Sequence, residues 1–143
     1  IMMINLNTGV IKLDGIVITP KSTLKDFTKY GKKVDIDDMG NGRGTVGLVN
    51  LFSSNGINAE IEIDINESRK YMYVYINPVI ENHPKLETLE ASKQWLKGMV
   101  IGEYTEDRDS LYGSYDWGYI VAQYREDRDY GIVGGEITIK YEG

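Results

Sequence analysis

Residues 57–65 read INAEIEIDI, and this stretch decides the fold. Apolar side chains occupy every second position from Ile57 to Ile65, and polar, mostly acidic side chains lie between them. A period of two predicts a β-strand, because successive side chains of a strand point to opposite faces of the sheet. The segment therefore predicts a strand with one buried face and one wet, acidic face, as is typical of antiparallel sheets.

Further strands are expected on both sides of this segment. After it, residues 71–76 place three tyrosines on one face and three apolar side chains on the other, which favours a central strand. Before it, Asp14 and Gly15 separate two short apolar runs and predict a tight hairpin. The other expected strands are residues 4–6, 45–52, 115–124 and 136–141, of which the last two form a hairpin with a long, charged loop.

Two helices are expected. In residues 23–30, Thr23 and Asp26 have the spacing of a capping box, and Leu24 and Phe27 recur at helical spacing. The second, longer helix begins near Pro84, which suits a first helical turn. Its apolar stripe contains Leu86, Leu89, Leu96 and Met99 with Trp95 at the edge, whereas Glu87, Glu90, Lys93 and Lys97 lie outside the stripe.

The order of these elements predicts an α+β fold. Because turns join the strands, we expect a mostly antiparallel sheet of about seven to eight strands, with both helices packed on one face. No linker or low-complexity stretch divides the chain, so residues 1–143 are expected to form a single domain.

Composition excludes several classes of function. The chain contains no cysteine, which excludes disulfides, thiolate zinc sites, iron–sulfur clusters and thiol nucleophiles. No cofactor is expected, and a cytoplasmic location fits the same observation. The net charge of −6 opposes binding to nucleic acid and to acidic membranes. It favours a basic protein as the partner, although such a charge is also ordinary for solubility.

A short acidic sequence, EDRD, occurs twice, at residues 106–109 and 126–129. A Tyr-Gly pair follows each copy closely. We expect the two loops to form one negative patch that docks a basic partner through Asp107, Asp109, Tyr112, Asp127, Asp129 and Tyr130. Two other interpretations stay open: a divalent-ion site, for which residues 35–41 are a further candidate, and solvated turns in which arginine screens the carboxylates.

The most aromatic segment surrounds Trp117. Tyr115, Asp116 and Trp117 form an alternative ligand-binding site, because aromatic rings stack on sugars and paired carboxylates hydrolyse glycosidic bonds. The competing interpretation is that Trp117 anchors the C-terminal hairpin in the core.

Residues 42–47 read GRGTVG and match the dinucleotide-binding fingerprint letter for letter. That site needs a strand before the glycines and a helix after them, so that amides and the helix dipole meet the pyrophosphate. Here a strand is expected to follow. We therefore interpret the match as accidental and the segment as a flexible hairpin loop.

The end of the chain carries a resemblance. Residues 117–120, Tyr124 and residues 137–141 resemble the ends of small uncharacterised bacterial proteins. Some of those proteins resemble immunity proteins that neutralise polymorphic toxins. The resemblance covers the C-terminal segment alone and implies no particular functional residue.

These observations support three functional hypotheses. The first is a non-enzymatic protein-binding module, as an immunity protein that blocks a basic toxin through an acidic, tyrosine-rich surface. The alternative is a small-ligand or carbohydrate-binding protein, or a hydrolase, that uses Trp117 and nearby carboxylates. The third is an accessory domain whose task is homo-oligomer assembly.

Overall fold

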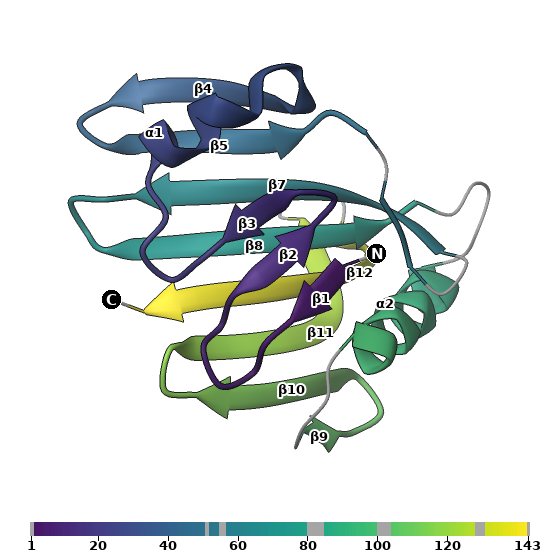
Figure 1. Ribbon diagram of the computed structural model, residues 1–143. Helices are drawn as coiled ribbons and strands as arrows, with labels where there is room; N and C mark the ends of the chain where they lie inside the picture. Colours follow the sequence, from purple (N-terminus) through teal and green to yellow (C-terminus); the bar gives the residue numbers. More distant parts are fainter. Residues whose placement is uncertain are drawn as a thin grey trace.

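The computed structural model describes residues 2–50, 52–54, 57–79, 85–99, 104–127 and 131–142. The described strands form two sheets, one of nine strands and one of three (Figure 1). Within each sheet, every pairing of the described strands is antiparallel. The predicted α+β class and its antiparallel sheet are therefore confirmed.

The small sheet is built by the N-terminal segment. Its strands are β1 (Met2–Ile4), β2 (Ile11–Leu13) and β3 (Ile16–Ile18). The predicted turn joins β2 to β3, and its residues Asp14 and Gly15 have φ angles of 47° and 83°. Positive φ at both central positions is the geometry of the tight hairpin turn that Asp-Gly favours.

The large sheet runs in the order β4-β5-β7-β8-β12-β11-β10-β9, and β6 pairs with β7. Its strands are β4 (Val34–Gly40), β5 (Arg43–Leu48), β6 (Phe52–Ser54), β7 (Ile57–Asn66), β8 (Tyr71–Pro78), β9 (Thr105–Glu106), β10 (Ser110–Tyr115), β11 (Gly118–Asp127) and β12 (Gly131–Glu142). The C-terminal strand β12 lies between β8 and β11 and so joins the two halves of the sheet.

Two helices accompany the sheets. Helix α1 (Leu24–Phe27) has the predicted capping box of Thr23 and Asp26, and a 3-10 segment, Thr28–Lys33, continues it. Helix α2 spans Lys85–Met99. Helix α1 contacts β4 and β5, whereas α2 contacts β12, β11 and β8. The packing of both helices on one face of a single sheet stays a prediction.

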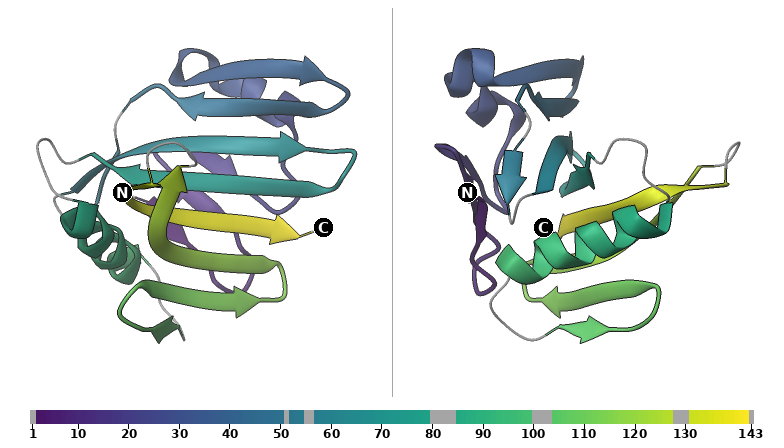
Figure 2. Two further views of the ribbon diagram at one scale, coloured as in Figure 1. Left: turned by 180° about the vertical axis from the view of Figure 1, so that it is seen from behind. Right: turned by 90° about the vertical axis from the view of Figure 1, so that its right-hand side faces the viewer.

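The core lies between the two sheets. The small sheet covers one face of the large sheet, in front of β8 and β12 in Figure 1 and to one side of them in Figure 2. Ile61, Ile63 and Ile65 of β7 are buried, as the alternation predicted. Ile11 and Ile18 of the small sheet belong to the same apolar cluster. Burial of these side chains is the main favourable term in folding.

The predicted number of strands was wrong, because the described chain contains nine strands in one sheet and three in another. Strand β4 was missed because its apolar and acidic residues alternate only over residues 34–37, and β10 was missed because it is rich in serine, glycine and tyrosine. Pairing with neighbouring strands supplies what these sequences lack in propensity.

Two loops are also shorter than predicted. The β11–β12 loop is short because β11 continues through Glu126 to Asp127. The glycine-rich match at residues 42–47 lies mostly in strand β5, where Gly44 and Gly47 pair with β7. The turn itself is formed by residues 40–42, all with positive φ.

The contact between α2 and β12 requires a glycine. A Cβ atom at Gly135 would overlap the backbone of Thr88 and Leu89 in α2. At Gly47, by contrast, a Cβ atom would meet no atom within 4 Å. We therefore expect Gly135→Ala to lower the free energy of unfolding by about 1–3 kcal/mol through overpacking.

The matched control Gly47→Ala is expected to change that free energy by less than about 0.5 kcal/mol. Urea denaturation of both variants measures the difference. Equal stability of the two variants would show that α2 does not pack against β12 in this way.

Candidate functional site

Strands β7 and β8 bring acidic and tyrosine side chains together on one face. Glu62 lies opposite Tyr75, and Asp64 lies opposite Tyr73. The same alternation that buries the isoleucines of β7 directs these side chains to the opposite face of the sheet. Figure 2, seen from behind, shows that no described helix lies over β7 and β8 on that face.

Strands β12 and β11 extend this surface. Lys140 of β12 lies opposite both Tyr73 and Tyr119, and Glu142 lies opposite Tyr71. We call this surface the acidic tyrosine face. It comprises Glu60, Glu62 and Asp64 of β7, Tyr71, Tyr73 and Tyr75 of β8, Lys140 and Glu142 of β12, and Tyr119 of β11.

This side of the sheet also concentrates negative charge. By the strand register, Asp35 and Asp37 of β4 lie on it next to β5. Glu136 of β12 is on the same side, and among the side chains that the structure describes, the register places the cations Arg43 and Lys140 there. Within the side chains that the structure describes, seven carboxylates therefore share one side of the large sheet with two cations.

The tyrosine rings contact one another along β8. The Tyr73 and Tyr75 rings stack with a centroid distance of 5.7 Å, and Tyr71 meets Tyr73 edge-on at 5.5 Å. The Lys140 ammonium lies 5.4 Å from the centroid of the Tyr73 ring and 3.7 Å from a carboxylate oxygen of Glu142. An aromatic face next to a carboxylate is thus already used to hold a cation within the protein.

The environment of these rings changes their acidity. Burial, followed by the charge of Asp64, raises the pKa of Tyr75 to about 12. Burial also raises the pKa of Tyr119. A hydrogen bond with the Tyr73 hydroxyl raises the pKa of Lys140. Because their pKa values are raised, Tyr75 and Tyr119 present neutral hydroxyl groups at neutral pH.

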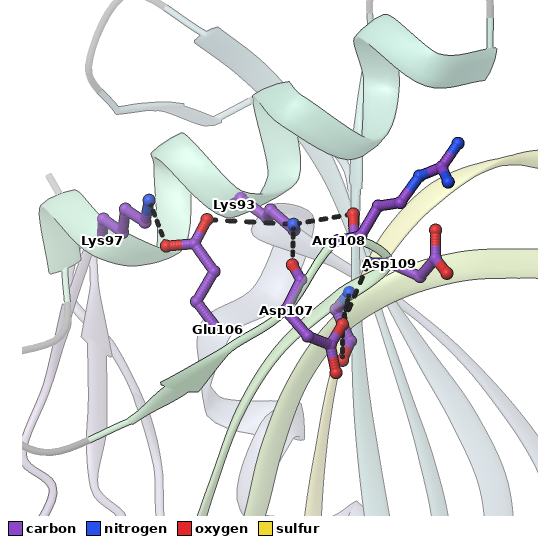
Figure 3. A network of polar contacts seen from close by, with 7 residues as sticks. Lys93, Lys97, Glu106, Asp107, Arg108 and Asp109 are labelled. Atoms are coloured by element: carbon purple, nitrogen blue, oxygen red, sulfur yellow. Dashed lines mark hydrogen bonds and ion pairs between the residues drawn. The ribbon is translucent and has the colours of Figure 1, made fainter.

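The first EDRD sequence forms an ordered turn (Figure 3). The Asp107 carboxylate accepts hydrogen bonds from the backbone N–H groups of Asp109 and Ser110 and from the Ser110 hydroxyl. These bonds lower the pKa of Asp107, with the backbone bond from Asp109 as the largest cause. The carboxylate of Asp107 is therefore engaged within its own turn, whereas Asp109 is exposed.

Lys93 supports this turn from helix α2. Its ammonium donates hydrogen bonds to the backbone carbonyls of Asp107, at 2.8 Å, and Arg108, at 3.2 Å. Its side chain is 4% exposed and also lies 3.8 Å from a Glu106 carboxylate oxygen. The prediction that Lys93 lies outside the buried stripe of the helix was wrong, because turn carbonyls satisfy its ammonium in the interior.

Trp95 differs from the prediction in the same helix. The Trp95 side chain is fully buried with the side chains of Leu89 and Leu96, so it lies at the centre of the buried surface and not at the edge.

The structure describes only some of the predicted partner-binding residues. Tyr112 is exposed on β10, at the margin of the large sheet. Strand β11 ends at Asp127. Strand β10 begins at Ser110, which pairs with Gln123, four residues before Asp127. Residues 106–109 and the described residues of the second acidic sequence, 126 and 127, therefore lie toward the same end of the sheet. Asp129 and Tyr130 lie outside the described residues.

The predicted alternative site is packed into the protein. Trp117 is 7% exposed, and its indole N–H donates a 2.7 Å hydrogen bond to the Leu6 carbonyl. Its ring stacks on Tyr115 at 5.2 Å and contacts Tyr141 at 5.4 Å. Asp116 is exposed in the adjacent turn. This arrangement favours the interpretation of Trp117 as the anchor of the C-terminal hairpin.

Within the described ranges, no group of three or more acidic or histidine side chains is arranged to hold a metal ion. None of the helices in the described part of the chain is long and apolar enough to cross a lipid bilayer. The comparisons with protein families, curated proteins and solved structures found no match to this chain.

The acidic tyrosine face was missed by sequence reasoning, although its parts were visible. The acidic face of residues 57–65 and the tyrosine face of residues 71–76 were both recognised separately. The turn at residues 67–70 between them signals a hairpin, and a hairpin pairs these strands. Which faces coincide depends on the register, and a slip of one residue would separate them.

Lys93 and Lys97 provide a test of the turn. We expect Lys93→Met to lower the free energy of unfolding by about 1–3 kcal/mol, because the carbonyls of Asp107 and Arg108 lose their charged donor. Lys97→Met removes the exposed ion pair between Lys97 and Glu106, whose atoms are 2.7 Å apart, and is expected to cost less than about 1 kcal/mol. Thermal denaturation compares the two, and a smaller loss for Lys93→Met would contradict this role.

Tyr75 provides a test of the face. Its phenol is expected to ionise with a midpoint near pH 12, above the ordinary value of 10.0. Because the pKa is raised in the folded state, the linked stability is complete below pH 10 and is lost as the pH rises toward 12. Phenolate absorbance of the wild type minus that of Tyr75→Phe isolates this group. A midpoint near pH 10 would show that Tyr75 is fully solvated.

Proposed function

We propose that this chain is a non-enzymatic protein-binding module that docks a basic protein on its acidic tyrosine face. The observation that carries the proposal is the cross-strand pairing of Glu62 with Tyr75 and of Asp64 with Tyr73. These pairs belong to a contiguous surface of carboxylates and aromatic rings on four adjacent strands of the large sheet, β7, β8, β12 and β11.

The chemistry of this surface suits protein recognition. Tyrosine offers a large contact area together with a polar tip, and it is enriched at the centres of interfaces. Carboxylates of one sign steer an oppositely charged partner and exclude partners of like charge. Arginine and lysine can bind both components, since they pair with carboxylates and lie over aromatic faces.

The biological role that we propose is that of an immunity protein. The resemblance of the C-terminal segment to immunity-like proteins motivates this role. A module without catalytic machinery could neutralise a basic toxin by covering its functional surface. The alternative role as a carbohydrate binder or hydrolase receives less support, because the ring of Trp117 is packed against Tyr115 and the N-terminal segment.

Protection against a neighbouring toxin tests the proposal. The protein encoded beside this chain in its genome is expressed with and without it, and growth and the dissociation constant are measured. We expect Glu62→Lys combined with Asp64→Lys to abolish protection and to weaken binding by about a hundredfold or more, because two attractive charges become repulsive. Binding by the wild type should also weaken as salt is added.

The matched control is Glu90→Lys combined with Asp116→Lys. Both residues are exposed outside the acidic tyrosine face, and the change in net charge is identical. We expect this variant to bind within a few-fold of the wild type, in line with the small effect of peripheral charges. Equal loss in both double variants would show that net charge alone governs binding, and would refute docking on this face.

A further inference from the structure

A recess opens beside the acidic tyrosine face where β7 changes its partner. Strand β7 pairs with β6 up to Ala59 and with β5 from Glu62. Between these two pairings, β5 diverges from β7 and leaves a recess of about 300 Å³. Its lining residues are Gly47, Leu48, Val49, Asn50, Glu60, Ile61, Glu62 and Asn77. We call it the Gly47 recess.

Gly47 keeps the recess open. It lies between Asp35 of β4 and Glu62 of β7 in the register, and a Cβ atom there would meet no atom within 4 Å. Its φ is not positive, so the backbone does not require glycine at this position. A glycine in a strand costs conformational entropy and contributes no packing. The main structural effect of glycine at position 47 is therefore that the recess is not filled by a side chain.

The recess combines acidic and apolar walls. Glu60 and Glu62 are both exposed on the same face of β7, and Asn77 lies opposite Glu60. Leu48 and Val49 line the recess from β5 and the residue that follows it, and Val49 is 52% exposed. A long cationic side chain fits these walls, because lysine and arginine lay an aliphatic stem along apolar surface and place a charged head among acceptors.

The protein already contains a cation bound in a similar way. The Lys140 ammonium lies over the Tyr73 ring and near Glu142 on this face. The recess offers Glu60 and Glu62 for a second cation, and Glu62 lies next to Tyr75 across the β7–β8 pair. In the described part of the recess lining, no lysine or arginine occupies this position.

We propose that the Gly47 recess receives one lysine or arginine side chain of the basic partner and thereby determines which partner docks. This inference rests on the proposed function, and it adds the residue type that is recognised and the place where it inserts. A second copy of this chain is disfavoured as the occupant, because the excess of carboxylates on this side of the sheet would repel itself.

The first test uses a defined probe. A short glycine-serine peptide with one central arginine is added to the isotope-labelled protein, and a peptide with citrulline, its neutral isostere, is the control. We expect the arginine peptide to shift the amide resonances of Gly47, Glu60 and Glu62, and to bind about tenfold or more weakly to Gly47→Leu and to Glu60→Gln. Equal shifts from the citrulline peptide would refute recognition of a cation.

The second test measures how tightly the complete partner protein binds to variants of the recess. Gly47→Leu fills the recess, and Asn7→Leu places the same side chain at an exposed position in the turn between β1 and β2 as the matched control. Thermal denaturation tests whether each variant folds. If Gly47→Leu does not fold, the near-isosteric variant Glu60→Gln still tests the recess. We expect Gly47→Leu and Glu60→Gln to weaken the partner's affinity about tenfold, and Asn7→Leu to leave it unchanged.

The outcomes separate this inference from the proposed function. If the double variant Glu62→Lys and Asp64→Lys loses the partner while Gly47→Leu and Glu60→Gln retain full affinity, the recess is refuted and the docking face stands. If all of these variants bind as the wild type does, both proposals are refuted. If Asn7→Leu weakens binding as much as Gly47→Leu, the effect is not specific to the recess, and the recess is refuted.

Discussion

The structure depends on one constraint, the alternation of side chains along antiparallel strands. Burial of Ile61 and Ile63 against the small sheet obliges Glu60, Glu62 and Asp64 to point the opposite way. The same constraint acts on β8, where burial of Val74 directs Tyr73 and Tyr75 outward. One energetic requirement, the removal of apolar surface from water, therefore creates both the core and the acidic tyrosine face.

The N-terminal segment completes this arrangement from the other side. The small sheet covers the apolar face, and the segment between its first two strands holds two aromatic side chains at the end of the large sheet. The carbonyl of Leu6 accepts a hydrogen bond from Trp117, and the carbonyl of Gly9 accepts one from Tyr141 at 2.7 Å. Both donors are buried polar groups that would be costly without partners. These contacts join residues near the two ends of the chain, and they give Trp117 a structural role.

Two kinds of acidic surface result, and they differ physically. In the turn at residues 106–109, the Asp107 carboxylate bonds to its own backbone and Lys93 supports the turn from beneath. On the sheet, Glu60 and Glu62 are exposed beside half-buried aromatic rings and a recess. A rigid sheet also positions side chains more accurately than a turn does, which favours the sheet as a binding surface.

The sequence by itself determined the α+β class, the Asp14-Gly15 hairpin, the capped helix after Thr23 and the two-faced strand at residues 57–65. Each is local: a period of two, a turn dipeptide or a capping box acts within a few residues. Only the tertiary structure decided that β4 and β10 are strands, that Lys93 is buried and that Trp117 is covered, because distant partners supply the pairing and hydrogen bonds. The acidic tyrosine face belongs to this second class, since register alone places Glu62 against Tyr75 and leaves Gly47 open beside them.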